Sequence, residues 1–229
     1  MKRSKINAVV ADADAFIRSF GFRLPEFAYW TPQDFNSAPE GCRIVEAAMG
    51  WDITDYGQGN FDDLGLVLFT LRNGDLTQQK SGQGMVYAEK LLISRQDQIS
   101  PMHTHVLKVE DIINRGGGKL VVELFGSDGG CGFSKDTGGQ VMIDGCPKDY
   151  APGTRIGLDP GQSVTLRPGD WHAFWGEGGD VLIGEVSSVN DDVNDNIFRD
   201  EIGRFSDVEE DVDPLRLLVS DYETFLNPA

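Results

Sequence analysis

The sequence has few cysteines and no long hydrophobic run, and both absences exclude classes of protein. Only Cys42, Cys131 and Cys146 occur among its 229 residues, and no two of them have the Cys-x-x-Cys spacing of thiolate metal sites. This pattern predicts neither a disulfide framework nor a zinc–thiolate site, and it fits a reducing compartment. No apolar stretch has the form of a signal peptide, and none is long enough to span a bilayer. We therefore expect a cytoplasmic protein that does not bind a membrane.

Basic residues are also scarce relative to acidic ones. Lysine and arginine number 20 against 37 aspartates and glutamates, which gives a formal net charge of -17. A field of this sign repels nucleic acids and anionic lipids, so we expect no nucleic-acid partner. The chain is 40% hydrophobic, which is enough for one substantial core, and a single domain is the simplest organisation.

Histidine is the third scarce residue, and all three copies fit one pattern. His103 and His105 stand two apart, so in a strand both would point from the same face into one cavity. Glu110 would follow from the turn or from the next strand, and His172 would come from a separate hairpin. Three imidazole nitrogens and one carboxylate oxygen are a donor set for divalent Mn, Fe, Co, Ni or Zn. The spacing therefore predicts a metal site.

Hydrophobic periodicity predicts helices at the two ends of the chain and strands between them. Apolar residues recur at three- and four-residue steps over residues 4–22, which indicates an amphipathic helix. A second helical segment is expected to start at Asp213-Pro214. The first strand is expected over residues 64–72, closed by a tight hairpin turn at Asn73-Gly74. Residues 24–60, rich in proline, glycine and aromatics, are expected to wrap around the strands.

Two charged residues stand in apolar strand-like segments. Lys90 is followed by Leu91, Leu92 and Ile93, so its ammonium either reaches the surface or points into a polar cavity. Glu185 would share a strand face with apolar neighbours, where an unpaired buried carboxylate would be costly. It therefore belongs either at a barrel rim or in a functional cavity.

The metal pattern resembles the two motifs of the cupin superfamily. These motifs are His103-x-His105-x4-Glu110-x6-Gly117 and Pro168-Gly169-x-x-His172. The resemblance implies an all-β jelly roll, or double-stranded β-helix, with the metal inside the barrel. Two turn positions depart from the pattern, since Asp97 and Gly176 stand where glycine and asparagine are common.

A longer set of segments resembles the D-lyxose isomerase family. The segments are Tyr87-Ala-Glu-Lys-Leu-Leu, the stretch from His103 to Gly118, and Gly184-Glu-Val-Ser-Ser-Val-Asn-Asp-Asp192. The resemblance implies interconversion of D-lyxose with D-xylulose, and commonly of D-mannose with D-fructose. It also implies a divalent cofactor, with Mn2+ favoured over Fe2+, Co2+, Ni2+ and Zn2+, and a homodimer. One cupin domain, 1–229, would then comprise an N-terminal extension (1–60), the barrel (61–190) and a C-terminal helical extension (191–229).

Aldose–ketose isomerisation requires a polarised carbonyl and a group that moves a proton. We expect Glu185 to be the general base, with Lys108 and Lys90 as the electrophilic partners that stabilise developing negative charge. Residues expected to recognise hydroxyl groups or relay a proton are Asp192, Glu201 and Arg204. The sequence leaves open whether hydrogen moves as a proton or as a metal-assisted hydride.

Two other functions share the same ligand set. An iron-dependent cupin dioxygenase would need a largely apolar pocket and would consume oxygen, whereas Lys90, Lys108 and Glu185 suit a sugar better. A non-catalytic cupin would bind a monosaccharide without turnover and would keep that function in Glu185→Gln.

Overall fold

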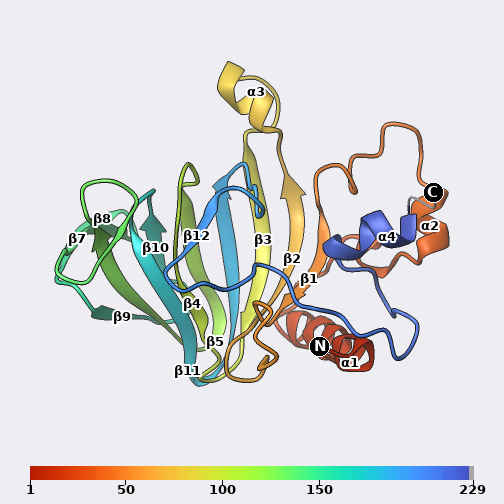
Figure 1. The fold of residues 1–229 in the computed structure, drawn as a ribbon, viewed down its shortest axis with the longest axis horizontal. Coiled ribbons are helices and arrows are strands. Elements are labelled where there is room, and N and C mark those ends of the chain that lie inside the picture. Colours follow the sequence, from red (N-terminus) through yellow and green to blue (C-terminus); the bar gives the residue numbers. More distant parts are fainter. Residues whose placement is uncertain (227–229) are drawn as a thin grey trace.

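Antiparallel strands make up most of the regular secondary structure in the computed structural model, which describes residues 1–226. The order along the sheet is β1-β2-β3-β11-β5-β10-β7-β8, while β4 pairs with β11 and β12, and both β6 and β9 pair with β5. The strands close into a barrel (Figure 1). Their bounds are β1 Gly50–Thr54, β2 Leu66–Asn73, β3 Tyr87–Ser94, β4 Ser100–His105, β5 Glu110–Ser127, β6 Phe133–Ser134, β7 Gly139–Ile143, β8 Cys146–Tyr150, β9 Thr154–Leu158, β10 Ser163–Leu166, β11 Trp171–Ser188 and β12 Asn196–Phe198.

The helices are few and mostly short. They are α1 Arg3–Ser19, η1 Glu26–Tyr29, α2 Pro32–Asn36, α3 Leu76–Ser81, η2 Val219–Asp221 and α4 Tyr222–Leu226. Figure 1 shows α1, α2 and α4 gathered on one side of the barrel beside β1, with α3 at one end. No helix within residues 1–226 is both long and apolar enough to cross a membrane.

Two hydrophobic clusters lie on opposite faces of the strands. Outside the barrel, Ile6, Val10 and Ile17 of α1 pack against Trp51 and Phe69 of the sheet. The predicted N-terminal helix is therefore confirmed, with its apolar stripe on the sheet. The second cluster fills the barrel interior and includes residues of β2, β3, β5 and β11.

Strand β1 lies inside the segment expected only to wrap around the barrel. Its residues alternate: Trp51 and Ile53 join the cluster under α1, whereas Asp52 pairs with Leu68 of β2, which lines the barrel interior. The alternation is the period of a half-buried strand.

The connection after β2 is longer than the predicted hairpin. Asn73 lies within β2, and its side chain donates to the carbonyls of Ala47 and Asn190 and accepts from the Asn190 amide. Asn73 therefore connects two distant loops and does not form a tight turn. Helix α3 lies in the connection between β2 and β3.

The C-terminal helical segment is shorter than predicted. Leu218 is extended and forms a β-bridge with Trp51, so helical structure starts only at Val219, and Asp213-Pro214 does not begin a helix. Leu215 is exposed whereas Leu217 and Leu218 are buried, a pattern that no single helical face explains. Residues 227–229 of this predicted segment lie outside the described residues.

A buried arginine joins the two ends of the described chain. The guanidinium of Arg3 has no exposed surface, donates twice to Asp221 at 2.8 Å and also bonds Glu210. Asp221 is itself buried. Removing the arginine would leave a buried carboxylate without its counter-charge, which is a costly change.

We expect Arg3→Met to lower the free energy of unfolding by about 3 kcal/mol, measured by urea denaturation. Lys5→Met is the matched control, because the Lys5–Asp62 pair is exposed and its loss should change stability by less than about 1 kcal/mol. Equal stability of the two variants would contradict a structural role for Arg3.

Candidate metal centre and substrate cavity

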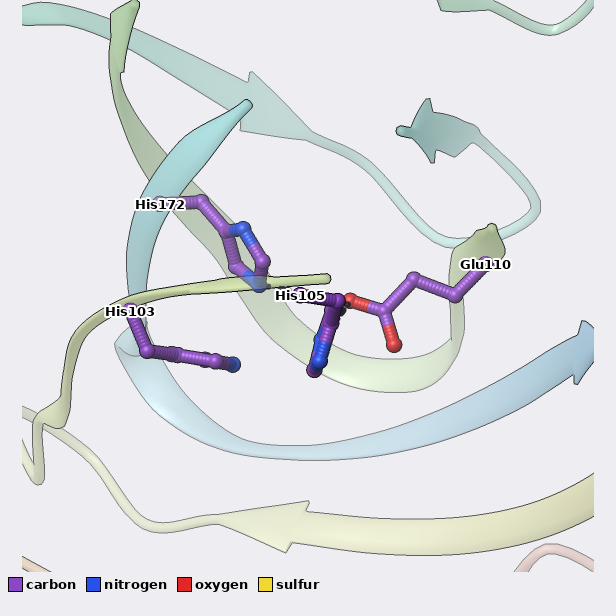
Figure 2. A group of neighbouring side chains, drawn as sticks. All are labelled: His103, His105, Glu110 and His172. Atoms are coloured by element: carbon purple, nitrogen blue, oxygen red, sulfur yellow. Dashed lines mark hydrogen bonds and ion pairs between the residues drawn. The ribbon is translucent and has the colours of Figure 1, made fainter. Parts of the chain in front are cut away.

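Four side chains from three strands converge inside the barrel. His103 and His105 come from β4, Glu110 begins β5, and His172 is the second residue of β11. One ligand atom of each lies within 4.8 Å of those of the others. Figure 2 shows their polar ends pointing toward one another. The register explains this convergence, because β11 pairs with both β4 and β5 and sets His172 opposite His103.

Backbone carbonyls orient two of the imidazole rings. His103 Nδ1 lies 2.8 Å from the Pro101 carbonyl, and His172 Nδ1 lies 3.0 Å from the Asp170 carbonyl. A carbonyl only accepts hydrogen bonds, so each Nδ1 must carry the proton. The Nε2 lone pair of each ring is therefore available to a cation, as in many metal-binding histidines.

The protonation states suit a cation. Burial, together with the neighbouring His172 and His105 rings, holds the pKa of His103 well below its ordinary value. Burial and the Lys108 ammonium likewise lower the pKa of His105. Burial disfavours ionised Glu110, but Lys108 and His105 outweigh it and hold the pKa of this carboxyl well below its ordinary value. The neutral imidazoles of His103 and His105 thus accompany an ionised Glu110.

An unpaired buried nitrogen shows that the cluster fits a metal ion. His172 Nε2 is inaccessible to solvent, lies 3.3 Å from Glu110 Oε1, and makes no hydrogen bond to residues 1–226. A buried lone pair without a partner is costly unless a ligand uses it. The space between the three imidazoles and the carboxylate can therefore hold a divalent cation.

A chain of alternating charges starts at Glu110. Lys108 Nζ lies 2.8 Å from Glu110 Oε2 and 3.2 Å from Glu185 Oε1. Lys90 Nζ lies 3.5 Å from the same Glu185 oxygen, and all three side chains beyond Glu110 are buried or nearly so. Glu185 is therefore held between two ammonium groups next to the metal ligands. Burial lowers the pKa of Lys108, but Glu110 and Glu185 outweigh it and raise the value.

The chain continues through Asp192 to Arg204 and Asp52. Lys90 Nζ lies 3.4 Å from Asp192 Oδ1, and Arg204 Nη2 lies 3.2 Å from Asp192 Oδ2 and 2.9 Å from Asp52 Oδ2. Burial raises the pKa of Asp192, but Arg204 and Lys90 more than offset it, so the value lies well below the ordinary one. This carboxylate is ionised at neutral pH.

One cavity brings most of the predicted site residues together. Its lining includes His103, His105, Lys108, Glu110, Glu185, Lys90, Asp192 and Arg204, and adds Tyr56, Leu66, Leu68, Leu92, Ser100, Ile112, Phe174, Asn196 and Phe198. Lys90 thus points into the polar cavity and not to the surface. Glu201 is exposed and lies outside this lining.

Sequence reasoning missed four residues that support the site. Asn190 accepts a hydrogen bond from Lys90 at 2.6 Å, and the Asp195 carboxylate accepts from the backbone amides of Leu107 and Lys108. Asn190 lies in the segment from Gly184 to Asp192 that carries the family resemblance, but the resemblance assigned it no role, and Asp195 lies in the acidic loop that follows. Asp52 and Tyr56 come from β1 and the turn after it, where alternation in residues 50–54 was the available signal.

The comparisons with known proteins agree over the whole chain. The D-lyxose isomerase family model matches residues 1–222. A D-lyxose/D-mannose isomerase of Serratia proteamaculans is 44% identical over 99% of this chain and 100% of its own length. A protein of the same name from Escherichia coli O157:H7 is 41% identical over 98% of this chain and 100% of its own length.

Solved structures show the same fold at low sequence identity. An Acinetobacter sp. DL28 L-ribose isomerase variant in complex with L-ribose has a TM-score of 0.61 at 14% identity, and covers 91% of this chain and 98% of its own. Cellulomonas parahominis L-ribose isomerase with L-psicose has a TM-score of 0.59 at 15% identity, with the same coverage. The predicted cupin jelly-roll class is confirmed. The chain belongs to the D-lyxose isomerase family of sugar isomerases.

Proposed function

We propose that the protein interconverts D-lyxose with D-xylulose and D-mannose with D-fructose, using a bound divalent cation, with Mn2+ preferred. The observation that carries the proposal is the position of Glu185, which is held between Lys90 and Lys108 in the cavity that the metal cluster also lines. The names of two full-length relatives, both called D-lyxose/D-mannose isomerase, support this choice of sugars.

The cavity lining supports a sugar more than a hydrophobic substrate. Charged groups alternate in sign along one wall, and they can donate to and accept from hydroxyl groups. Aromatic rings of Tyr56, Phe174 and Phe198 offer apolar surface for the C–H faces of a sugar. The dioxygenase alternative would lack a use for so many buried charges, and family membership also favours the isomerase.

The four ligands His103, His105, Glu110 and His172 would hold the cation. When bound, a divalent cation would polarise the substrate carbonyl and hold two neighbouring oxygens. Glu185 takes the proton from C2 of the aldose, next to the C1 carbonyl, and returns it to C1, while the proton of the O2 hydroxyl is transferred to O1. Its contacts with both lysines fix the carboxylate in the cavity, so the base is oriented before substrate enters.

The lysines and the outer charges bind and orient the substrate. Lys108 and Lys90 place positive charge beside the base, where it stabilises negative charge that develops on substrate oxygens. Asp192 and Arg204 lie farther along the charge chain and bind hydroxyl groups of the remaining sugar carbons. The family resemblance also supports a single domain, a homodimer and a cytoplasmic location, which we include in the proposal.

The proposed reaction can be tested with a panel of aldoses and ketoses. Chelator-treated protein should be inactive, and added Mn2+ should restore isomerisation of D-lyxose and D-mannose, measured by chromatography of the sugars. Metal should also raise the Tm in a concentration-dependent manner, because it binds only the folded protein.

The reaction should proceed equally well without oxygen. Turnover that requires oxygen would support the dioxygenase, and saturable sugar binding without any turnover would support the non-catalytic cupin. Failure to isomerise any pentose or hexose with Mn2+, Fe2+, Co2+, Ni2+ or Zn2+ would contradict the proposed function.

Removing the carboxylate of Glu185 should stop proton transfer. We expect Glu185→Gln to lower kcat by about 10²–10⁴-fold while it still binds metal, and the wild-type product formed in D2O should carry deuterium at C1 or C2. Glu177→Gln, an exposed glutamate of the same strand, is the control and should keep wild-type kcat. Wild-type turnover in Glu185→Gln, or product free of solvent deuterium, would favour hydride transfer without this base.

A further inference from the structure

The strongest unexplained feature beyond these residues is the pair formed by Arg204 and Asp52. Asp52 is buried at 2% exposure in β1, and its Oδ2 accepts from Arg204 Nη2 at 2.9 Å. Its Oδ1 is buried and has no hydrogen-bond partner within residues 1–226. Burial raises the pKa of Asp52, and the neighbouring Arg204 guanidinium opposes this shift.

The same contact leaves part of the arginine free. Arg204 Nη2 bonds both Asp52 and Asp192, whereas Nη1 is buried and has no partner in the described part of the chain. Arg204 lines the cavity. A guanidinium nitrogen that is desolvated without an acceptor is costly, and a ligand oxygen is the group that would satisfy it.

Strand β1 and the turn after it also fix the backbone around Arg204. Thr54 Oγ1 donates to the Arg204 carbonyl at 2.7 Å, and the Gly203 amide donates to the Tyr56 carbonyl. Tyr56 has a φ of +55°, a conformation uncommon for a residue with a side chain. The irregular segment that carries Arg204 is thus attached to β1 through its backbone, and Asp52 adds the contact to its side chain.

We propose that Asp52 is a positioning residue that holds Arg204 so that Nη1 binds a substrate hydroxyl, and that this subsite takes an oxygen beyond C2 of the open-chain sugar. The order of contacts supports the location, because Lys90 and Asp192 separate Arg204 from Glu185, where the reacting carbons lie. The inference rests on the proposed function only for the orientation of the sugar. Asp52 does not line the cavity and acts through Arg204.

The fold alone does not need a charge at this position. Arg204 would keep Asp192 as a counter-charge in Asp52→Asn, and asparagine has nearly the same shape as aspartate. We therefore expect Asp52→Asn to keep the Tm within a few degrees of the wild-type value. A merely structural role would instead lower the Tm and leave the affinity of the folded protein for sugar unchanged.

The test uses a ligand that cannot be isomerised. D-Arabinitol, the polyol obtained by reducing D-lyxose, has the hydroxyl groups of the open-chain sugar but no carbonyl. Its binding to the Mn2+-loaded protein is measured by calorimetry for the wild type, Asp52→Asn, Arg204→Gln and the double variant. Asp55→Asn is the matched control, because Asp55 is also buried and follows β1 but makes no ion pair in the described structure.

We expect Asp52→Asn to weaken binding of the polyol by about tenfold and to raise KM by a similar factor, with kcat changed by less than about threefold. In the Arg204→Gln background the same substitution should have no further effect, because the two residues act as one unit. Asp55→Asn should bind as the wild type does.

Three results would overturn the proposal. They are unchanged affinity in Asp52→Asn, an equal further loss in the double variant, and no saturable polyol binding by the wild type. If Asp52→Asn does not fold, Arg204→Lys decides: its single ammonium can pair with Asp52 but cannot supply the second donor, so unchanged affinity would contradict the subsite. If the affinity for the polyol depends on Asp52 as expected but the wild type isomerises no sugar, the proposed function is contradicted and this inference stays intact.

Discussion

The ionised carboxylate of Glu110 is the group on which the rest of the site depends. It is buried, so it requires positive charge nearby, and it has Lys108 on one side and the imidazole cluster on the other. Lys108 is buried in turn and requires a second carboxylate, which is Glu185. Every charged group from Glu110 to Asp52 thus has a partner of opposite sign, and Asp192 is the most exposed of them. The resulting chain of four carboxylates and three cations has an excess of one negative charge, which a divalent cation on the cluster would reverse.

Strand register makes this arrangement possible without strained backbone at the charged residues. Lys90, Glu185 and Ile112 lie opposite one another on β3, β11 and β5, and the adjacent inward position of β5 is Glu110. Because side chains alternate between the two faces of a strand, Lys90 and Glu185 point into the cavity at one level of the sheet, and the metal ligand Glu110 points into it at the adjacent level. A slip of one residue in β11 would turn Glu185 out of the cavity, so the pairing of this strand fixes the chemistry.

The sequence predicted those parts of the site that follow from spacing, and it could not predict those that follow from packing. His103, His105, Glu110 and His172 were recognisable because metal ligands have regular separations, and the structure brings them together. The position of Lys90 stayed open, since only the contacts with Glu185 and Asn190 decide where an ammonium group points. Glu201 has the right chemistry but is exposed. Only the apolar–polar alternation of its strand pointed to Asp52. Its role depends on the contact with Arg204, which lies 152 residues later in the sequence. The helix expected to start at Asp213-Pro214 does not form there, because Leu218 is extended and forms a β-bridge with Trp51. Local periodicity does not reveal such a long-range contact.

The most direct measurement of the central claim is a calorimetric titration with Mn2+ of the chelator-treated wild type and of Glu110→Gln, with Glu123→Gln of the same strand as control. The wild type and the control should each bind one ion per chain at the cluster, and Glu110→Gln should bind at least about 100-fold more weakly, because it loses both a ligand and the charge that the chain is built around. Equal affinity in Glu110→Gln, or no binding by the wild type, would contradict a metal centre organised by this carboxylate.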